Sequence, residues 1–142
     1  MRVMVIVKGD ERSEAGVMPT EQELAEMGTF NEELVNAGIM LAGEGLHPTS
    51  KGVKVKFDGD ARTVVDGPFT ETKEVLGGFW IWQVGSMQEA TEWAKKIPFR
   101  KGEVEIRPVF ETEEFAESDP TGEQRRREHE LRARIEAQQA GG

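Results

Sequence analysis

Two short apolar runs constrain the fold of this chain more than any other feature of its sequence. Residues 3–7 and residues 79–84 place bulky apolar side chains at nearly every position. Side chains alternate between the two faces along a β-strand, so each run sends apolar groups to both faces of a sheet. We therefore expect both faces of that sheet to be covered.

Two amphipathic helices are expected to supply part of the cover. Thr20 and Glu23 form a capping-box pattern, and apolar residues then recur at helical spacing until Gly38 offers a C-terminal stop. Ser86 and Glu89 repeat the capping-box pattern ahead of a second amphipathic stretch, which a proline ends.

The remaining elements are short strands and loops. Residues 39–42 and 103–110 are expected to be strands, whereas the polar residues 9–18 are expected to form a loop. Val53, Val55 and Phe57 alternate with charged residues, and an Asp-Gly-Asp turn then leads back through Arg62 to Val65. This pattern predicts a hairpin with one face covered and the other in water.

The order β-α-β, hairpin, β-α-β predicts an α+β fold of the ferredoxin-like type. In that fold both helices cover the same face of one antiparallel sheet, so the second face needs another cover. That face is expected to hold Met4, Ile6, Trp80 or its neighbours, and Val84. A second copy of the chain is the simplest cover, which predicts a homodimer.

Composition limits the possible functions. The 142 residues fit one domain at residues 1–116 and a charged tail at residues 117–142, with a helix at residues 121–140. A net charge of −9 argues against direct binding to nucleic acid, and no apolar run is long enough to span a membrane. We expect a cytoplasmic protein. The chain contains no cysteine and no metal-ligand or cofactor motif, so neither a metal nor a cofactor is expected.

Residues 66–82 gather more chemically useful side chains than any other stretch. This stretch opens with the turn sequence Asp66-Gly67-Pro68-Phe69. We expect Asp66 either to bind a ligand or to form a hydrogen bond with the backbone two residues further along the chain. Charged residues follow, and then a glycine pair that indicates positive φ or a close backbone approach. The candidate ligand-binding residues of this stretch are Glu71, Lys73, Glu74 and Trp80. For Trp80 a place in the core is the alternative.

A second group of candidates lies outside that stretch. His47 sits in a turn with glycines, and imidazole titrates near neutral pH, so His47 and Asp66 are the candidate catalytic residues. Glu44 and Arg107 are further candidate ligand-binding residues. The alternatives are a purely structural turn histidine and, for Arg107, an ion pair with the nearby Glu105.

Several segments together resemble one known family. They are Asp66-Gly67-Pro68-Phe69, Glu71-Thr72-Lys73-Glu74, Gly77-Gly78-Phe79-Trp80, residues 43–48 and Glu105-Ile106-Arg107-Pro108. This combination is similar to the DGPF branch of the YCII-related family over residues 1–116. The resemblance implies a ferredoxin-like fold of the dimeric α+β barrel type without a settled activity. It also implies a histidine on the first helix, where alignment on Gly38 finds Met27.

Two functions stay open. The first is a small-molecule-binding protein or enzyme whose site lies near the DGPF loop, beside His47, at a dimer cleft. The second is a regulatory or interaction module without chemistry, which the acidic body and the charged tail favour. For this second function the resemblance implies a regulatory protein partner connected with sigma factors.

Overall fold

The computed structural model describes residues 1–69 and 75–141. The chain divides into two compact units, Met1–Pro108 and Val109–Gly142. The division between residues 116 and 117 that we expect from the sequence stays a prediction.

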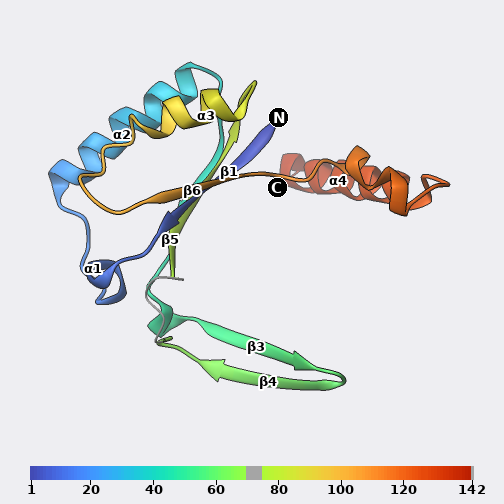
Figure 1. Cartoon of the computed structure of the whole chain (residues 1–142), viewed down its shortest axis with the longest axis horizontal. Coiled ribbons are helices and arrows are strands. Elements are labelled where there is room, and N and C mark those ends of the chain that lie inside the picture. Colours follow the sequence, from blue (N-terminus) through green and yellow to red (C-terminus); the bar gives the residue numbers. More distant parts are fainter. Residues whose placement is uncertain (70–74, 142) are drawn as a thin grey trace. The chain divides into compact units, whose positions relative to one another are not determined.

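The first unit is built on a four-stranded antiparallel sheet with the strand order β2-β5-β1-β6 (Figure 1). Its strands are β1 (Arg2–Lys8), β2 (Met40–Gly45), β5 (Leu76–Gln83) and β6 (Val104–Pro108). Helices α2 (Glu21–Asn36) and α3 (Met87–Ala94) lie on the same side of this sheet (Figure 1). This is the ferredoxin-like α+β topology, so the predicted fold class is confirmed.

The two helices begin where the capping patterns indicate. At α2, Glu23 N–H donates to Thr20 Oγ1 at 3.1 Å and Thr20 N–H donates to Glu23 Oε1 at 3.0 Å, which completes the capping box. At α3, Glu89 N–H donates to Ser86 Oγ at 3.1 Å. The Glu89 carboxylate accepts from Gly85 N–H at 2.7 Å, so the reciprocal half of the second box goes to a different residue.

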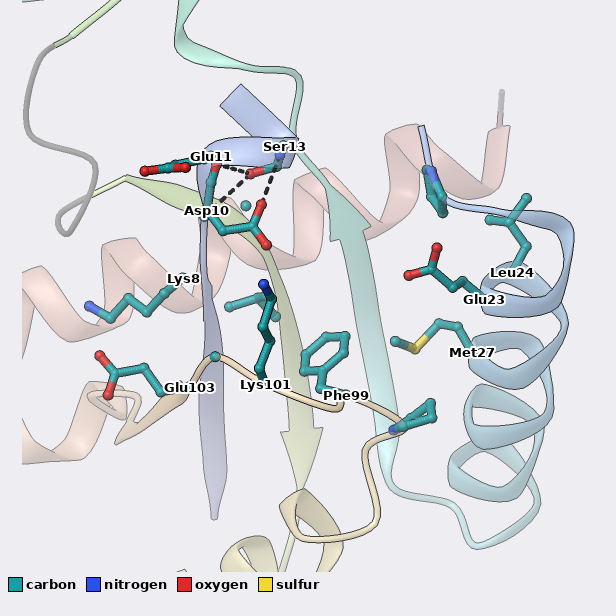
Figure 2. Close-up of a pocket in the computed structure, with 16 residues that line it drawn as sticks. Lys8, Asp10, Glu11, Ser13, Glu23, Leu24, Met27, Phe99, Lys101 and Glu103 are labelled. Carbon is teal, nitrogen blue, oxygen red and sulfur yellow. Dashed lines mark hydrogen bonds between the residues drawn. The ribbon is translucent and has the colours of Figure 1, made fainter. Parts of the chain in front are cut away.

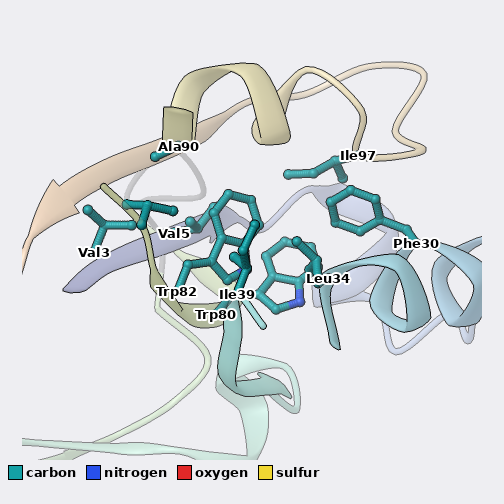
Figure 3. Close-up of a cluster of buried hydrophobic side chains, with 10 residues drawn as sticks. Val3, Val5, Phe30, Leu34, Ile39, Trp80, Trp82, Ala90 and Ile97 are labelled. Carbon is teal, nitrogen blue, oxygen red and sulfur yellow. The ribbon is translucent and has the colours of Figure 1, made fainter. Parts of the chain in front are cut away.

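The core lies between the sheet and the two helices (Figure 3). Strand register places Val3 opposite Trp82 and Val5 opposite Trp80, so these four side chains share the helix side. The other core residues are Phe30, Leu34, Ile39, Val84, Ala90 and Ile97. Trp82 is fully buried, and burial of a large apolar side chain contributes about 1.5–3 kcal/mol.

The opposite face of the sheet carries the intervening side chains. The residues on it include Met4, Ile6, Phe79 and Ile81, which are all partly exposed. The expectation that Trp80 itself and Val84 lie there was wrong, because both belong to the helix-side core. The neighbours of Trp80 take that place, since alternate β5 positions face opposite sides.

Strands β3 (Val53–Asp58) and β4 (Ala61–Asp66) form a separate two-stranded sheet (Figure 1). Gly59 adopts φ +58° in the turn between them, as the Asp-Gly-Asp sequence predicts. The expectation of one covered face was wrong for the single chain. Every residue of β3 is exposed, because the hairpin adds to no other strand among the described residues.

Residues 9–18 contain an element that the sequence reading missed. A short helix, α1 (Glu11–Glu14), forms there with Asp10 as its N-cap. A 3-10 turn, η1 (Thr49–Lys51), links β2 to the hairpin.

The second unit holds a 3-10 segment, η3 (Thr112–Ser118), and the long helix α4 (Glu123–Gly141), so the predicted C-terminal helix is confirmed. Asp119 caps α4 by accepting the N–H groups of Gln124 at 3.2 Å and Arg125 at 2.9 Å. The Arg125 N–H is the main reason that the pKa of Asp119 is lowered.

Across residues 1–69 and 75–141, no helix is both long and apolar enough to cross a membrane.

Candidate functional site

A cavity of about 760 Å³ lies where β1 ends and the chain turns into α1 (Figure 2). Its walls come from residues 7–13, the first turns of α2 and the 98–103 segment ahead of β6. A smaller cavity of about 230 Å³ adjoins it. The two share the lining residues Val7, Met27, Gly77 and Phe99.

One wall of the larger cavity is apolar. Leu24 and Met27 project from α2, and Phe99 lies across from them (Figure 2). Leu24 is 59% exposed and Phe99 is 43% exposed, so this wall is open to an incoming molecule. Met27 lies on α2, at the position where the family resemblance implies a histidine. Its side chain lines both cavities.

Charged side chains border the same space, and two of them, Lys8 and Glu23, are already in ion pairs. Lys8 Nζ lies 3.2 Å from Glu105 Oε1, and Glu23 Oε1 lies 3.6 Å from the Arg12 guanidinium. Lys101 points toward Asp10 (Figure 2), but it forms no ion pair with any described residue. Its ammonium group is therefore available to a ligand.

Asp10 is held in place by the start of α1. Ser13 N–H donates to Asp10 Oδ1 at 2.8 Å, and Asp10 N–H donates to Ser13 Oγ at 2.9 Å. The Ser13 N–H is the main cause of the lowered pKa of Asp10, and the charges of Arg12 and Lys101 lower that pKa further. Asp10 thus places a fixed anionic acceptor beside the Lys101 donor.

The Asp-Gly-Pro-Phe turn is anchored on Thr49. Phe69 N–H donates to Thr49 Oγ1 at 3.1 Å, and Gly67 N–H donates to Gly52 O at 2.9 Å. A Cβ atom on Gly67 would overlap the Thr49 carbonyl oxygen, which explains the glycine at this position. The residue two positions after Asp66 is Pro68, which has no N–H, so the expected hydrogen bond from Asp66 cannot form.

Thr49 connects this turn to the wall of the cavity. Thr49 N–H donates to Glu14 Oε1 at 2.9 Å, and Thr49 Oγ1 donates to Glu14 Oε2 at 2.5 Å. Glu14 ends α1, and the cap and first turn of α1 line the larger cavity. The signature turn therefore supports the site through two hydrogen-bonded residues.

Two of the predicted site residues line the smaller cavity, Glu44 and Trp80. Trp80 is 5% exposed, and its Nε1–H already donates to Asn31 Oδ1 at 3.0 Å. Glu44 pairs with Phe79, so its side chain lies on the sheet face away from the helices. Neither offers a free polar side-chain group to this cavity.

The other described candidates line neither cavity. His47 is exposed in the segment between β2 and η1, and Asp66 is exposed at the end of β4. Arg107 is exposed on β6, with its Nε 3.9 Å from Glu105 Oε2. The candidates Glu71, Lys73 and Glu74 lie outside the described residues.

The glycine pair of the signature borders the cavities through its backbone. Gly77 lines both of them, and Gly78 lines the smaller one. Neither has positive φ, but a Cβ atom on Gly78 would lie 2.7 Å from Glu44 O. Of the two expectations for this pair, the close backbone approach is confirmed for Gly78, and the positive φ is wrong.

The residues that sequence reasoning missed are Asp10, Leu24, Phe99 and Lys101. They come from three segments that are distant in the sequence, and the fold brings them together. The spacing of Asp10 and Ser13 was the one local signal, because it matches a reciprocal N-terminal cap. Within the described residues, no group of three or more His, Cys, Asp or Glu side chains is placed to hold a metal ion.

Comparison with known proteins gives three findings. The chain is 29% identical over 92 residues to the uncharacterized protein R00369 of Rhizobium meliloti (strain 1021), covering 63% of this chain and 74% of that protein. Its structure is similar, with TM-score 0.45 and 16% identity, to 5-chloro-2-hydroxyhydroquinone dehydrochlorinase (TftG) from Burkholderia phenoliruptrix AC1100 in complex with 2,5-dihydroxybenzoquinone. That likeness covers 78% of this chain and 94% of the other. The model of the YCII-related domain matches residues 1–113, and the chain therefore belongs to the YCII-related family.

Proposed function

We propose that this protein binds a small organic molecule in the larger cavity. One observation carries the proposal. A single space of about 760 Å³ combines an exposed apolar wall with the ammonium group of Lys101, which is unpaired among the described residues, and the ionised carboxylate of Asp10. Sites for organic ligands typically occupy about 300–1,000 Å³ and pair apolar walls with a few polar groups.

The lining defines the chemistry of the ligand. A flat or compact apolar body would pack against Leu24, Met27 and Phe99. Lys101 would donate to a carbonyl or anionic oxygen, and Asp10 would accept from a neighbouring hydroxyl or amine. If the protein is an enzyme, Lys101 would stabilise negative charge that develops on the substrate, and Asp10 would orient a substrate donor by accepting its hydrogen bond.

A ligand screen on matched variants tests this proposal. Met27→Trp fills the space between the two cavities, Lys101→Met removes the free ammonium, and Lys56→Met removes an exposed hairpin lysine as the control. Hits found by ligand-observed NMR should be lost with Met27→Trp and weakened about tenfold or more with Lys101→Met. They should bind Lys56→Met unchanged. Unaltered binding to Met27→Trp, with its melting temperature preserved, would contradict the proposal.

A position beside Asp66 and His47 is a second proposed site. Both side chains are exposed on segments that meet at η1, so they are accessible to a ligand there. In this version the site lies at the seam of a homodimer. The Asp66→Asn variant would then weaken binding while Lys101→Met would not.

An interaction module is the second proposed function. It is supported by the second unit, in which no residue of α4 is buried. A helix that buries none of its own residues gains its stability from a partner more readily than from its own chain. Capture of a regulatory protein by the full chain, but not by a chain that ends at residue 117, would support this function.

A further inference from the structure

The β3–β4 hairpin has one apolar face that no described residue of the chain covers. Cross-strand register defines that face, because residues directly opposite each other point the same way. Its six residues are Val53, Val55, Phe57, Arg62, Val64 and Asp66. The four apolar ones are between 46% and 71% exposed.

Such a hairpin needs a partner. A two-stranded hairpin alone in water is marginally stable at best, and stability requires further strands or packing on a hydrophobic face. Both outer edges of this hairpin are unpaired among the described residues. Apolar side chains concentrated on one exposed surface indicate an interaction site.

The charges on this face are ordered along the hairpin. Arg62 lies near the turn, with its guanidinium 4.7 Å from the centre of the Phe57 ring. Arg62 Nη1 donates to Gly59 O and to Ala61 O, each at 2.8 Å, which keeps the positive charge at the tip. Asp66 is the last residue of β4, so the negative charge lies at the base. Apolar side chains separate the two.

We propose that this face packs against the same face of a second copy of the chain, with the tip of each hairpin over the base of the other. A two-fold axis that runs parallel to this face and perpendicular to the strands produces this arrangement. It places β4 of each copy over β4 of the other. Val64 then meets its own counterpart at the axis, and Arg62 of each copy lies over the partner's Asp66. The face is self-complementary in both charge and apolar character, as an isologous interface requires.

This contact is distinct from the small-molecule cavity and from the second face of the four-stranded sheet. It uses only residues of the hairpin, so it can be probed separately. Because the chain contains no cysteine, a single introduced cysteine reports on one position. The matched pair is Val64→Cys on the apolar face and Thr63→Cys on the opposite face, where Thr63 pairs with Lys56.

Disulfide cross-linking of the full chain under mild oxidation gives the first test. Val64→Cys should form covalent dimers rapidly, whereas Thr63→Cys should not. Equal yields from the two variants, or no dimer from Val64→Cys, would overturn the proposal. A dimer formed only through the four-stranded sheet would give no covalent dimer from Val64→Cys.

Charge exchange in the Val64→Cys background gives the second test. Arg62→Asp alone places two acids opposite each other at each contact, and Asp66→Arg alone places two bases there. Each should slow cross-linking by more than about tenfold, since like charges face to face cost several kcal/mol. An equimolar mixture of the two variants should restore it, because opposite charges meet again. Single variants that cross-link normally, or a mixture that stays slow while both variants show wild-type circular dichroism, would refute the arrangement.

Discussion

Replacing Thr49 by valine should destabilise the protein more than its position in a surface turn suggests. The Thr49 hydroxyl donates to Glu14 Oε2 at 2.5 Å and accepts from Phe69 N–H at 3.1 Å. Valine keeps the branched shape and loses both hydrogen bonds. The Thr49 N–H still donates to Glu14 Oε1, so the loss is confined to the hydroxyl.

The loss of unfolding free energy follows from the two hydrogen bonds of the Thr49 hydroxyl. A hydrogen bond to a charged group contributes about 1.5–3 kcal/mol, and one between neutral groups about 0.5–1.5 kcal/mol. Both contacts are only partly buried, so the lower ends of these ranges apply. We expect Thr49→Val to lower the free energy of unfolding by about 2 kcal/mol.

Urea unfolding followed by tryptophan fluorescence measures this difference. Thr29→Val is the matched control, because the Thr29 hydroxyl only donates to Ala25 O within α2 at an exposed site. It should change the unfolding free energy by no more than about 0.5 kcal/mol. Equal midpoints for Thr49→Val and Thr29→Val would show that the signature turn does not depend on Thr49.

Three further predictions concern stability and assembly. Gly78→Val should lower the urea midpoint well below that of His47→Ala, because a Cβ atom on Gly78 would lie 2.7 Å from Glu44 O; equal midpoints would disprove this. The lowered pKa of Asp10, set mainly by the Ser13 N–H, means that its ionised form adds stability above its ordinary value of 3.8 and loses that contribution as the pH falls through the folded pKa. The stability difference between wild type and Asp10→Asn should therefore shrink in acid, and a difference independent of pH would count against it. Light scattering should give at least twice the chain mass of 15.9 kDa, since we expect the second faces of two sheets to pack together, and a monomer at micromolar concentration would argue against that homodimer.

The fold was predictable because its signals are local. The Thr20 and Glu23 capping box set the start of α2, and the double-sided apolar runs predicted the strands β1 and β5. Alternation also located the first strand of the hairpin, and the Asp-Gly-Asp turn located the second. Alternation alone does not tell which β5 residues face the helices, because shifting the strand register by one residue exchanges the two faces of the strand. Trp80 and its neighbours were therefore left as alternatives for the outer face, and Val84 was placed there wrongly.

The site was less predictable because it depends on contacts between distant segments. The signature stretch drew attention to Asp66 and its charged neighbours, yet its described turn residues serve mainly to hold backbone through Thr49. Lys101 lies in a loop with no recognisable motif, and only the fold brings it beside Asp10. Single residues that meet through long-range packing leave no pattern in the sequence.

The most direct test of the account is to map a bound ligand by amide chemical-shift changes in uniformly labelled protein. A hit from the ligand screen should shift the amides of Gly9, Met27, Phe99 and Lys101, which border the larger cavity. The amides of residues 47–69 should move little. Changes confined to residues 47–69, with the cavity amides unmoved, would contradict the proposed site.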